Sequence, residues 1–351
     1  MVKVRNSWLV VTYRCNNRCN WCYASLDPFE PDTKPKNVDM PFDMALSSLD
    51  LIKGIDAKKV ILIGGEPTVY TKLPEVVKYA KKIGLNVGMV SNGRKFSDQH
   101  YLDSLMEAGL DGSSFSIHGS TAEIHDTITR RPNSFEETVQ GIINYQKTGK
   151  VVSTSTTMSK ENLGDLENIV HFLGRIGVEK VGFTTCTTSP GSKSNPGMIS
   201  PYEASQLIQK LYLVGKKAGI EVRSVTPLPL CNFDPEIRDE MLREGILNYS
   251  CSMHHGSGMA IDPEGNLLPC VHWSDFPVGS VLNSKGKVIS VEEFRELWSG
   301  EDNLPTRFRK SLWRFPSAAC KQDTKYWGEC IGGCPTFWTD FDPEKEIKGF
   351  G

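Results

Sequence analysis

The 351-residue sequence has no long apolar run and no excess of charge of either sign. Its longest apolar runs, such as Val60 to Ile63, are far shorter than the roughly 20 residues that a membrane-spanning helix needs. Lys and Arg number 40 and Asp and Glu number 42, so no basic surface indicates a nucleic-acid partner. Met1–Ser7 lacks the apolar core of a signal peptide, so we expect a cytoplasmic protein with no membrane and no nucleic-acid partner.

The ten cysteines are the most informative residues of the sequence. Hydrophobic residues make up 39% and charged residues 23%, which is ordinary globular composition and excludes wholesale disorder. In a reducing compartment, a cysteine-rich chain of this size is expected to bind metal or to use thiols in catalysis rather than to form disulfides. The ten cysteines are Cys15, Cys19, Cys22, Cys186, Cys231, Cys251, Cys270, Cys320, Cys330 and Cys334.

Strand-like and amphipathic helix-like segments alternate through the first two-thirds of the chain. Pro41 and Pro201 mark helix starts, and a glycine follows each of six helices: Gly54, Gly84, Gly109, Gly149, Gly177 and Gly219. Six βα units imply a parallel sheet wrapped by helices, either a partial barrel or a doubly wound sheet, with its site at the carboxyl ends of the strands. The predicted strands are 7–14, 59–63, 86–90, 112–117, 151–158 and 178–184. The helix predicted after the fifth strand has one apolar face, formed by Leu166, Ile169, Val170 and Leu173.

After residue 220 this alternation is lost. Proline and glycine become frequent, and one short helix is expected near 288–298. Because such a region buries little regular core, bound metal is the natural source of its order. We therefore predict two domains, an α/β domain over 1–220 and a small irregular cysteine-rich domain over 221–351.

The first cysteine cluster follows the first predicted strand as Cys15-x3-Cys19-x-Trp21-Cys22. Three thiolates in one short loop can hold three irons of a four-iron cluster and leave the fourth iron open to a ligand. The alternative is a zinc site, although zinc cysteines usually come as C-x2-C pairs.

This loop resembles the signature of the radical S-adenosylmethionine (SAM) superfamily. The resemblance implies a (β/α)6 partial TIM barrel in which the three cysteines hold a 4Fe–4S cluster and SAM binds the open iron. It further implies reductive cleavage of SAM to a 5′-deoxyadenosyl radical, hydrogen-atom abstraction from substrate, and an electron donor such as flavodoxin or ferredoxin.

Other predicted strand ends fit the same resemblance. The segment Gly64–Pro67 is similar to the GGEP motif of the family, in which glycine backbone approaches SAM and the glutamate pairs with its amino group. By the same resemblance, the cofactor-binding candidates are Trp21, Gly64, Gly65, Glu66, Pro67, Ser91, Asn92, Ser116 and His118.

The C-terminal cysteines resemble the auxiliary-cluster extension called SPASM, or its shortened form, twitch. The pattern departs from a full SPASM motif because only Cys320 precedes Cys330 and no cysteine follows Cys334. We expect at least one auxiliary iron–sulfur cluster, most simply on Cys231, Cys251, Cys270 and Cys334. Cys320 and Cys330 then form a partial second site or replace Cys231; structural zinc is the alternative. Asp323, His254 or His255 are candidate non-cysteine ligands.

Cys186 stands outside both sets and follows the sixth predicted strand. It is a candidate hydrogen-atom donor to a substrate radical, and the alternative is a small buried packing residue.

Four functions stay open. The first, which we expect, is modification of a peptide or protein by epimerisation, thioether formation or carbon–carbon cross-linking. The second is dehydrogenation, epimerisation or decarboxylation of a small molecule in natural-product or cofactor biosynthesis. The third is maturation of another enzyme, and the fourth is a non-catalytic iron–sulfur carrier or sensor. Strand one begins by residue 7 and leaves no room for an N-terminal peptide-recognition domain, which weighs against the first.

Overall fold

A single ten-stranded sheet organises the protein in the computed structural model, which describes residues 4–22, 24, 38–187, 197–274, 276–312, 315–320 and 325–349. The strand order is β10-β9-β8-β1-β2-β3-β4-β5-β6-β7, and every neighbouring pair from β8 through β1 to β7 is parallel. The strands are β1 (Asn6–Thr12), β2 (Lys59–Gly64), β3 (Asn86–Ser91), β4 (Gly112–Ser116), β5 (Ser153–Met158), β6 (Lys180–Thr185), β7 (Glu221–Ser224), β8 (Gly258–Ile261), β9 (Asn266–Leu268) and β10 (Gly279–Ser280).

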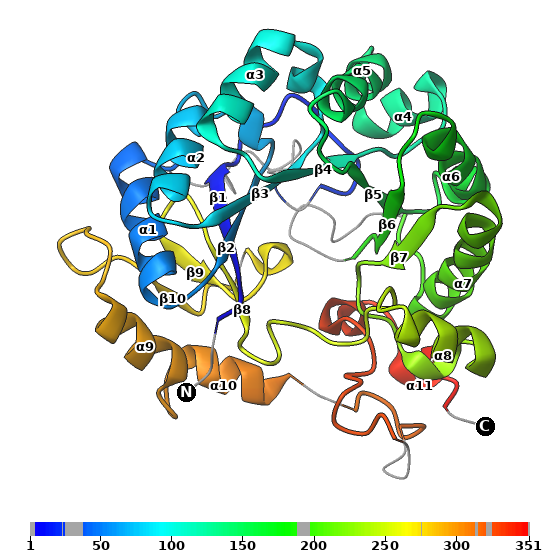
Figure 1. Ribbon diagram of the computed structural model, residues 1–351. Helices are drawn as coiled ribbons and strands as arrows, with labels where there is room; N and C mark the ends of the chain where they lie inside the picture. The colour runs from blue at the N-terminus through cyan, green and yellow to red at the C-terminus, as the bar shows by residue number, and fades with distance from the viewer. Residues whose placement is uncertain are drawn as a thin grey trace.

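The helices cover the outer side of this sheet, which curves into an open ring (Figure 1). The α-helices are α1 (Phe42–Gly54), α2 (Leu73–Lys82), α3 (Gln99–Ala108), α4 (Ala122–Thr129), α5 (Ser134–Gln146), α6 (Leu166–Arg175), α7 (Pro201–Ala218), α8 (Pro235–Arg243), α9 (Val291–Ser299), α10 (Leu304–Ser311) and α11 (Pro343–Glu346). Short 3₁₀ helices are η2 (Pro67–Val69), η3 (Arg94–Ser97), η4 (Leu163–Asp165), η6 (Leu230–Asn232), η7 (Val271–Trp273) and η8 (Pro335–Thr339).

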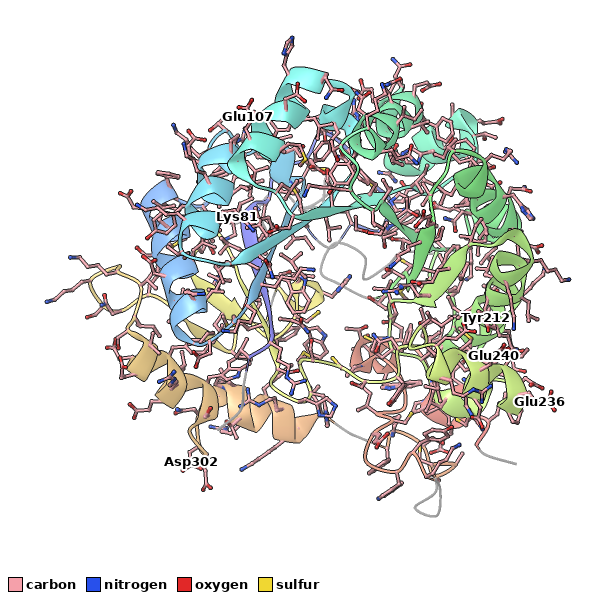
Figure 2. The ribbon with its side chains drawn as sticks, viewed as in Figure 1. Lys81, Glu107, Tyr212, Glu236, Glu240 and Asp302 are labelled. Atoms are coloured by element: carbon pink, nitrogen blue, oxygen red, sulfur yellow. The ribbon has the colours of Figure 1, made fainter. Side chains whose placement is uncertain are left out.

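The predicted α/β partial barrel is confirmed. Each of the six predicted strands overlaps an observed one, and the apolar face predicted for α6 is the face that the helix buries. Exposed carboxylates lie on the opposite side of the helices: Glu107 of α3 and Glu236 of α8 point outward in Figure 2. Burying one helical face and hydrating the other is what holds such helices against a sheet.

Two local predictions about the helices are wrong. Gly54 does not end α1 in a left-handed conformation; it is the last helical residue, and Asp56 has the positive φ of 65°. Helix α4 was not predicted, because it ends at Arg130 in the left-handed region rather than at a glycine. Its sequence is also rich in β-branched residues, which are weak helix formers.

The region after residue 220 contains more regular structure than its sequence pattern indicates. Strand β7 adds a seventh parallel strand beside β6, and β8 pairs with the opposite edge strand β1. Strands β8 and β9 form a hairpin with a glycine turn. Gly265 has a φ of +80° in this turn, and Asp262 accepts hydrogen bonds from the backbone N–H groups of Glu264 and Asn266. The division into domains at residue 220 stays a prediction, since strand pairing continues across it.

None of the helices within the described ranges is long and apolar enough to cross a membrane.

Candidate functional site

The loop from Cys15 to Cys22 leaves β1 and is held by backbone hydrogen bonds from two neighbours. On one side, the N–H of Gly65 donates to Thr12 O (2.9 Å) and the N–H of Glu66 donates to Arg14 O (2.8 Å). On the other side, the N–H of Arg18 donates to Thr129 O (2.9 Å) at the end of α4. The unpredicted helix α4 therefore fixes the far side of the cysteine loop.

The three thiols of this loop are close enough for their charges to interact. Burial first, and then Glu66 and Cys22, raise the pKa of the Cys15 thiol to about 12. Burial, and then Cys22 and Cys15, raise the pKa of Cys19 well above its usual value. The N–H of Asn17 donates to Cys15 Sγ at 3.3 Å. Three thiolates held this close repel one another unless a cation offsets their charge, which is the chemistry of a metal-binding set.

The Gly64-Gly65 pair permits the close approach of the second loop to the first. A Cβ atom on Gly65 would lie 2.5 Å from the carbonyl oxygens of both Tyr13 and Arg14, and one on Gly64 would lie 2.2 Å from Thr12 O. Only glycine fits at this distance. Pro67 begins the 3₁₀ helix η2 directly after the pair.

Glu66 is buried and already accepts four hydrogen bonds. Its Oε1 accepts from Thr68 N (3.0 Å), Thr68 Oγ1 (2.7 Å) and Ser91 Oγ (2.8 Å), and its Oε2 accepts from Asn92 N (2.6 Å). Burial raises the pKa of this carboxyl while these hydrogen bonds lower it. Glu66 thus ties the end of β2 to the end of β3.

Asn92 and Arg94, which follow β3, reach back to the cysteine loop. Asn92 Nδ2 donates to Asn16 Oδ1 (2.6 Å) and lies 3.9 Å from Cys15 Sγ. Arg94 Nη1 donates to Asn16 O (2.6 Å) and to Asn17 Oδ1 (2.9 Å), while its Nε pairs with Glu137 of α5. Arg94 was not predicted as a site residue; its position directly after Ser91-Asn92-Gly93 is the only signal in the sequence.

An aromatic row runs from the cysteine loop into the barrel wall. The rings of Trp21 and His118 meet edge to face at 5.3 Å, and His118 stacks on His125 of α4 at 5.8 Å. Burial lowers the pKa of His118 to about 3, so the ring is neutral. His118 Nδ1 accepts the N–H of Thr157 at 3.3 Å, which places the ring proton on Nε2.

Ser116 lies among hydroxyl groups on the half-buried face of the central strands. Along each strand, the side chains of this face alternate with buried side chains that pack under the helices. The Ser155 and Thr184 hydroxyls are 3.3 Å apart across β5 and β6. The half-buried hydroxyl residues are Ser114, Ser116, Ser153, Ser155, Thr157 and Thr184.

Cys186 is buried directly after β6 and packs in one apolar cluster with Trp21 and Ile128. Burial, and then the charge of Glu161, raise the pKa of its thiol to about 12. The thiol is therefore protonated at neutral pH and lies beside the last turn of the cysteine loop.

All ten cysteines lie within the described residues, and all are free thiols. Six of them form two further groups of three. Burial first, and then Cys251 and Cys334, raise the pKa of Cys270 to about 12, and Cys251 likewise raises the pKa of Cys334 to about 11. We call Cys251, Cys270 and Cys334 the hairpin trio, because the β8–β9 hairpin separates its first two members.

The other group is Cys231, Cys320 and Cys330, which we call the C-terminal trio. Burial first, and then Cys330 and Cys320 among other groups, raise the pKa of Cys231 to about 11. All three thiols line a pocket of about 380 Å³, including space open to solvent, together with the stacked rings of Phe315 and Trp327.

This grouping differs from the expected set of Cys231 with Cys251, Cys270 and Cys334. Cys231 lies in η6 and neighbours the C-terminal thiols instead. Asp323 lies outside the described residues, and His254 and His255 line a separate pocket. Across the described residues, no three His, Cys, Asp or Glu side chains converge closely enough to hold a single metal ion.

Comparison with known proteins agrees with this geometry. Residues 9–173 match the family model of the Radical SAM superfamily. The chain is 27% identical over 296 residues to the AdoMet-dependent heme synthase of Methanosarcina barkeri, covering 83% of this chain and 81% of that one. It is 29% identical to the tungsten-containing aldehyde ferredoxin oxidoreductase cofactor-modifying protein of Pyrococcus furiosus, covering 88% and 85%. A second heme synthase, from Oleidesulfovibrio alaskensis, is 29% identical, and the match covers 61% of this chain and 54% of that relative.

Two solved structures share the fold. SuiB of Streptococcus suis bound to S-adenosylmethionine superposes with a TM-score of 0.70 at 14% identity, covering 99% of this chain and 76% of that one. The anSMEcpe structure with bound AdoMet also gives 0.70 at 14% identity, covering 97% and 96%.

Fold and site together define an enzyme that starts radical chemistry from SAM. Residues 9–173 form a radical SAM domain, and enzymes of the radical SAM superfamily use a 4Fe–4S cluster and SAM.

We predict that Arg94→Gln weakens the cysteine loop. The substitution removes two hydrogen bonds to the loop and the ion pair to Glu137, a loss of about 2 kcal/mol in the free energy of unfolding. Anaerobically reconstituted protein should then contain less iron and show weaker visible absorption than wild type. The exposed Arg243→Gln on α8 is the control. Equal iron in both variants contradicts this role for Arg94.

Proposed function

We propose that Cys15, Cys19 and Cys22 hold a 4Fe–4S cluster with one iron left for SAM. The donor set fits such a group, because three thiols, none of them in a disulfide, lie in one loop at the carboxyl end of β1. When bound, the cluster and SAM supply the one-electron chemistry that generates the 5′-deoxyadenosyl radical. The electron donor we propose is a flavodoxin or a ferredoxin.

The surrounding residues bind and position SAM in this proposal. Gly64 and Gly65 expose their backbone beside the cluster loop, and Trp21, Ser116 and His118 form the adjoining wall. Ser91 and Asn92, also proposed to contact SAM, are fixed by hydrogen bonds to Glu66 at the neighbouring strand end, where Pro67 begins η2. Glu66 already accepts four hydrogen bonds, so a bond from the SAM amino group would be a fifth bond to its carboxylate. Its main contribution is to fix the ends of β2 and β3.

We further propose that the hairpin trio and the C-terminal trio each hold an auxiliary 4Fe–4S cluster with three cysteine ligands. The support is that thiols within each trio interact electrostatically. In a four-iron cluster each thiolate binds a different iron, whereas zinc draws all its ligands to one point. The sulfurs of each trio are neighbours but do not surround a single metal position, which favours iron–sulfur clusters over zinc.

For the substrate, we propose a small molecule of the tetrapyrrole type. The observation that carries this choice is that relatives matched over most of this chain are named for heme or cofactor synthesis, including a Fe-coproporphyrin III synthase and a pre-heme d1 synthase. A peptide is the second candidate, because SuiB, whose fold this chain shares, has been solved bound to its precursor peptide SuiA.

Iron counting tests the three-cluster assignment. Wild-type protein reconstituted anaerobically should bind about twelve irons and about twelve sulfides per chain. Replacing Cys15, Cys19 and Cys22 with Ala should remove about four irons and all SAM cleavage. Replacing Cys231, Cys320 and Cys330 with Ala should also remove about four irons but leave SAM cleavage intact. A wild-type count near eight that the second variant does not lower refutes the C-terminal cluster.

Mass spectrometry of anaerobic reactions tests the substrate class. An iron porphyrin with carboxylate side chains should stimulate 5′-deoxyadenosine formation and change in mass, because the proposed site accepts a tetrapyrrole. A cysteine-containing peptide supplied in its place should give neither result. Modification of the peptide alone would establish the second candidate instead.

We also propose that Cys186 donates a hydrogen atom to the substrate radical, after which the external electron donor and a proton restore the thiol. Its protonated thiol and its position beside Trp21 support this role. With Cys186→Ala, 5′-deoxyadenosine should still form while product formation falls at least tenfold. Ile128→Val, a change in the same apolar cluster, is the control and should keep turnover. Equal turnover in both variants makes Cys186 a packing residue.

A further inference from the structure

A basic pocket lies beside the turn that carries Cys251. Its lining residues come from this turn, from the ends of α9 and α10, and from the C-terminal segment, and it encloses about 840 Å³ including space open to solvent. Helices α9 and α10 lie next to each other along the lower edge of the molecule in Figure 1. The lining residues are His254, His255, Ser299, Thr306, Arg309, Lys310 and Gly328.

Arg309 is held rigidly at this pocket. Its Nη2 donates to Trp298 O (2.5 Å) and to Thr306 Oγ1 (2.9 Å), and its guanidinium carbon lies 4.7 Å from the centroid of the Trp298 ring. Trp298 in turn donates from Nε1 to Gly256 O at 2.9 Å, which ties the helix to the cysteine turn. The guanidinium is therefore oriented before any ligand arrives.

One nitrogen of this guanidinium has no partner. Arg309 Nη1 is buried without a hydrogen bond among the described residues. A buried donor of a charged group left unpaired costs free energy, and an anion that enters the pocket would satisfy it.

The charged side chains that line the pocket are basic. Lys310 and the two histidines line it with Arg309, and no Asp or Glu is among its described lining residues. Within the described ranges, neither Arg309 nor Lys310 forms an ion pair. The nearby Asp302 is exposed and points away from the protein (Figure 2).

We propose that this pocket binds a small anion through a carboxylate or a phosphate group. Arg309 supplies the N–H donors of its unpaired Nη1, Lys310 supplies a charge at the rim, and Thr306 and Ser299 supply hydroxyl groups. A small anion fits better than the acidic surface of a partner protein, because Arg309 lines a hollow rather than a flat face. The proposal needs no metal at the cysteines.

Isothermal titration calorimetry of the anaerobically reconstituted protein tests this site. Inorganic phosphate and succinate are the two probes, and they distinguish a phosphate ligand from a carboxylate ligand. At least one should bind saturably. Arg309→Gln and Lys310→Gln should each weaken that binding by about tenfold or more. Arg307→Gln, an exposed residue of α10 outside the pocket, should leave it unchanged.

Each outcome decides the proposal. If Arg309→Gln fails to fold, Lys310→Gln and His255→Gln carry the test at the rim. The absence of saturable binding by both probes refutes the site, as does binding that none of the pocket variants weakens. Binding of an acidic ferredoxin that depends on Lys310, without binding of either small anion, assigns the face to a protein partner instead. Iron content and SAM cleavage of the same preparation show separately whether the proposed clusters are present.

Discussion

The structure depends on one constraint, which is that three thiols must stay together in the loop after β1. When these thiols ionise, burial and mutual repulsion work against this arrangement, which is why the pKa values of Cys15 and Cys19 are raised. Three contacts oppose it. The glycine pair after β2 lies against the start of the loop, Arg94 holds its middle, and the end of α4 binds the backbone of Arg18. The barrel brings these segments to one edge, because parallel strands end on the same side.

Much of this arrangement could be predicted from local sequence. The cysteine spacing, the strand before it and the Gly64-Gly65 pair are adjacent in the chain, and periodicity identified the buried face of α6. What escaped prediction depends on long-range contacts. Arg94 matters because it reaches Asn16 across the barrel edge, and α4 lacks the glycine that marks the other helix ends. The division of six cysteines into two trios follows from the folding of the C-terminal segment, which spacing does not encode.

The roles of single residues also depend on the folded state. From its motif, Glu66 was expected to pair with the amino group of SAM, yet its oxygens join two strand ends. Cys186 has a protonated thiol beside Trp21, a position consistent with both hydrogen donation and packing. The similarity to SuiB extends over the fold at 14% identity, while two relatives of higher identity are named a heme synthase and a cofactor-modifying protein. We base the substrate proposal on the relatives of higher identity.

The most direct test of the account is whether SAM binds the iron that the cysteine loop leaves free. Electron–nuclear double resonance on the reduced wild-type protein, with SAM labelled by ¹⁵N at the amino group and ¹⁷O at the carboxylate, measures this contact. The account predicts hyperfine coupling from both labels to a 4Fe–4S cluster. Bound SAM that shows no coupling from either label would contradict it.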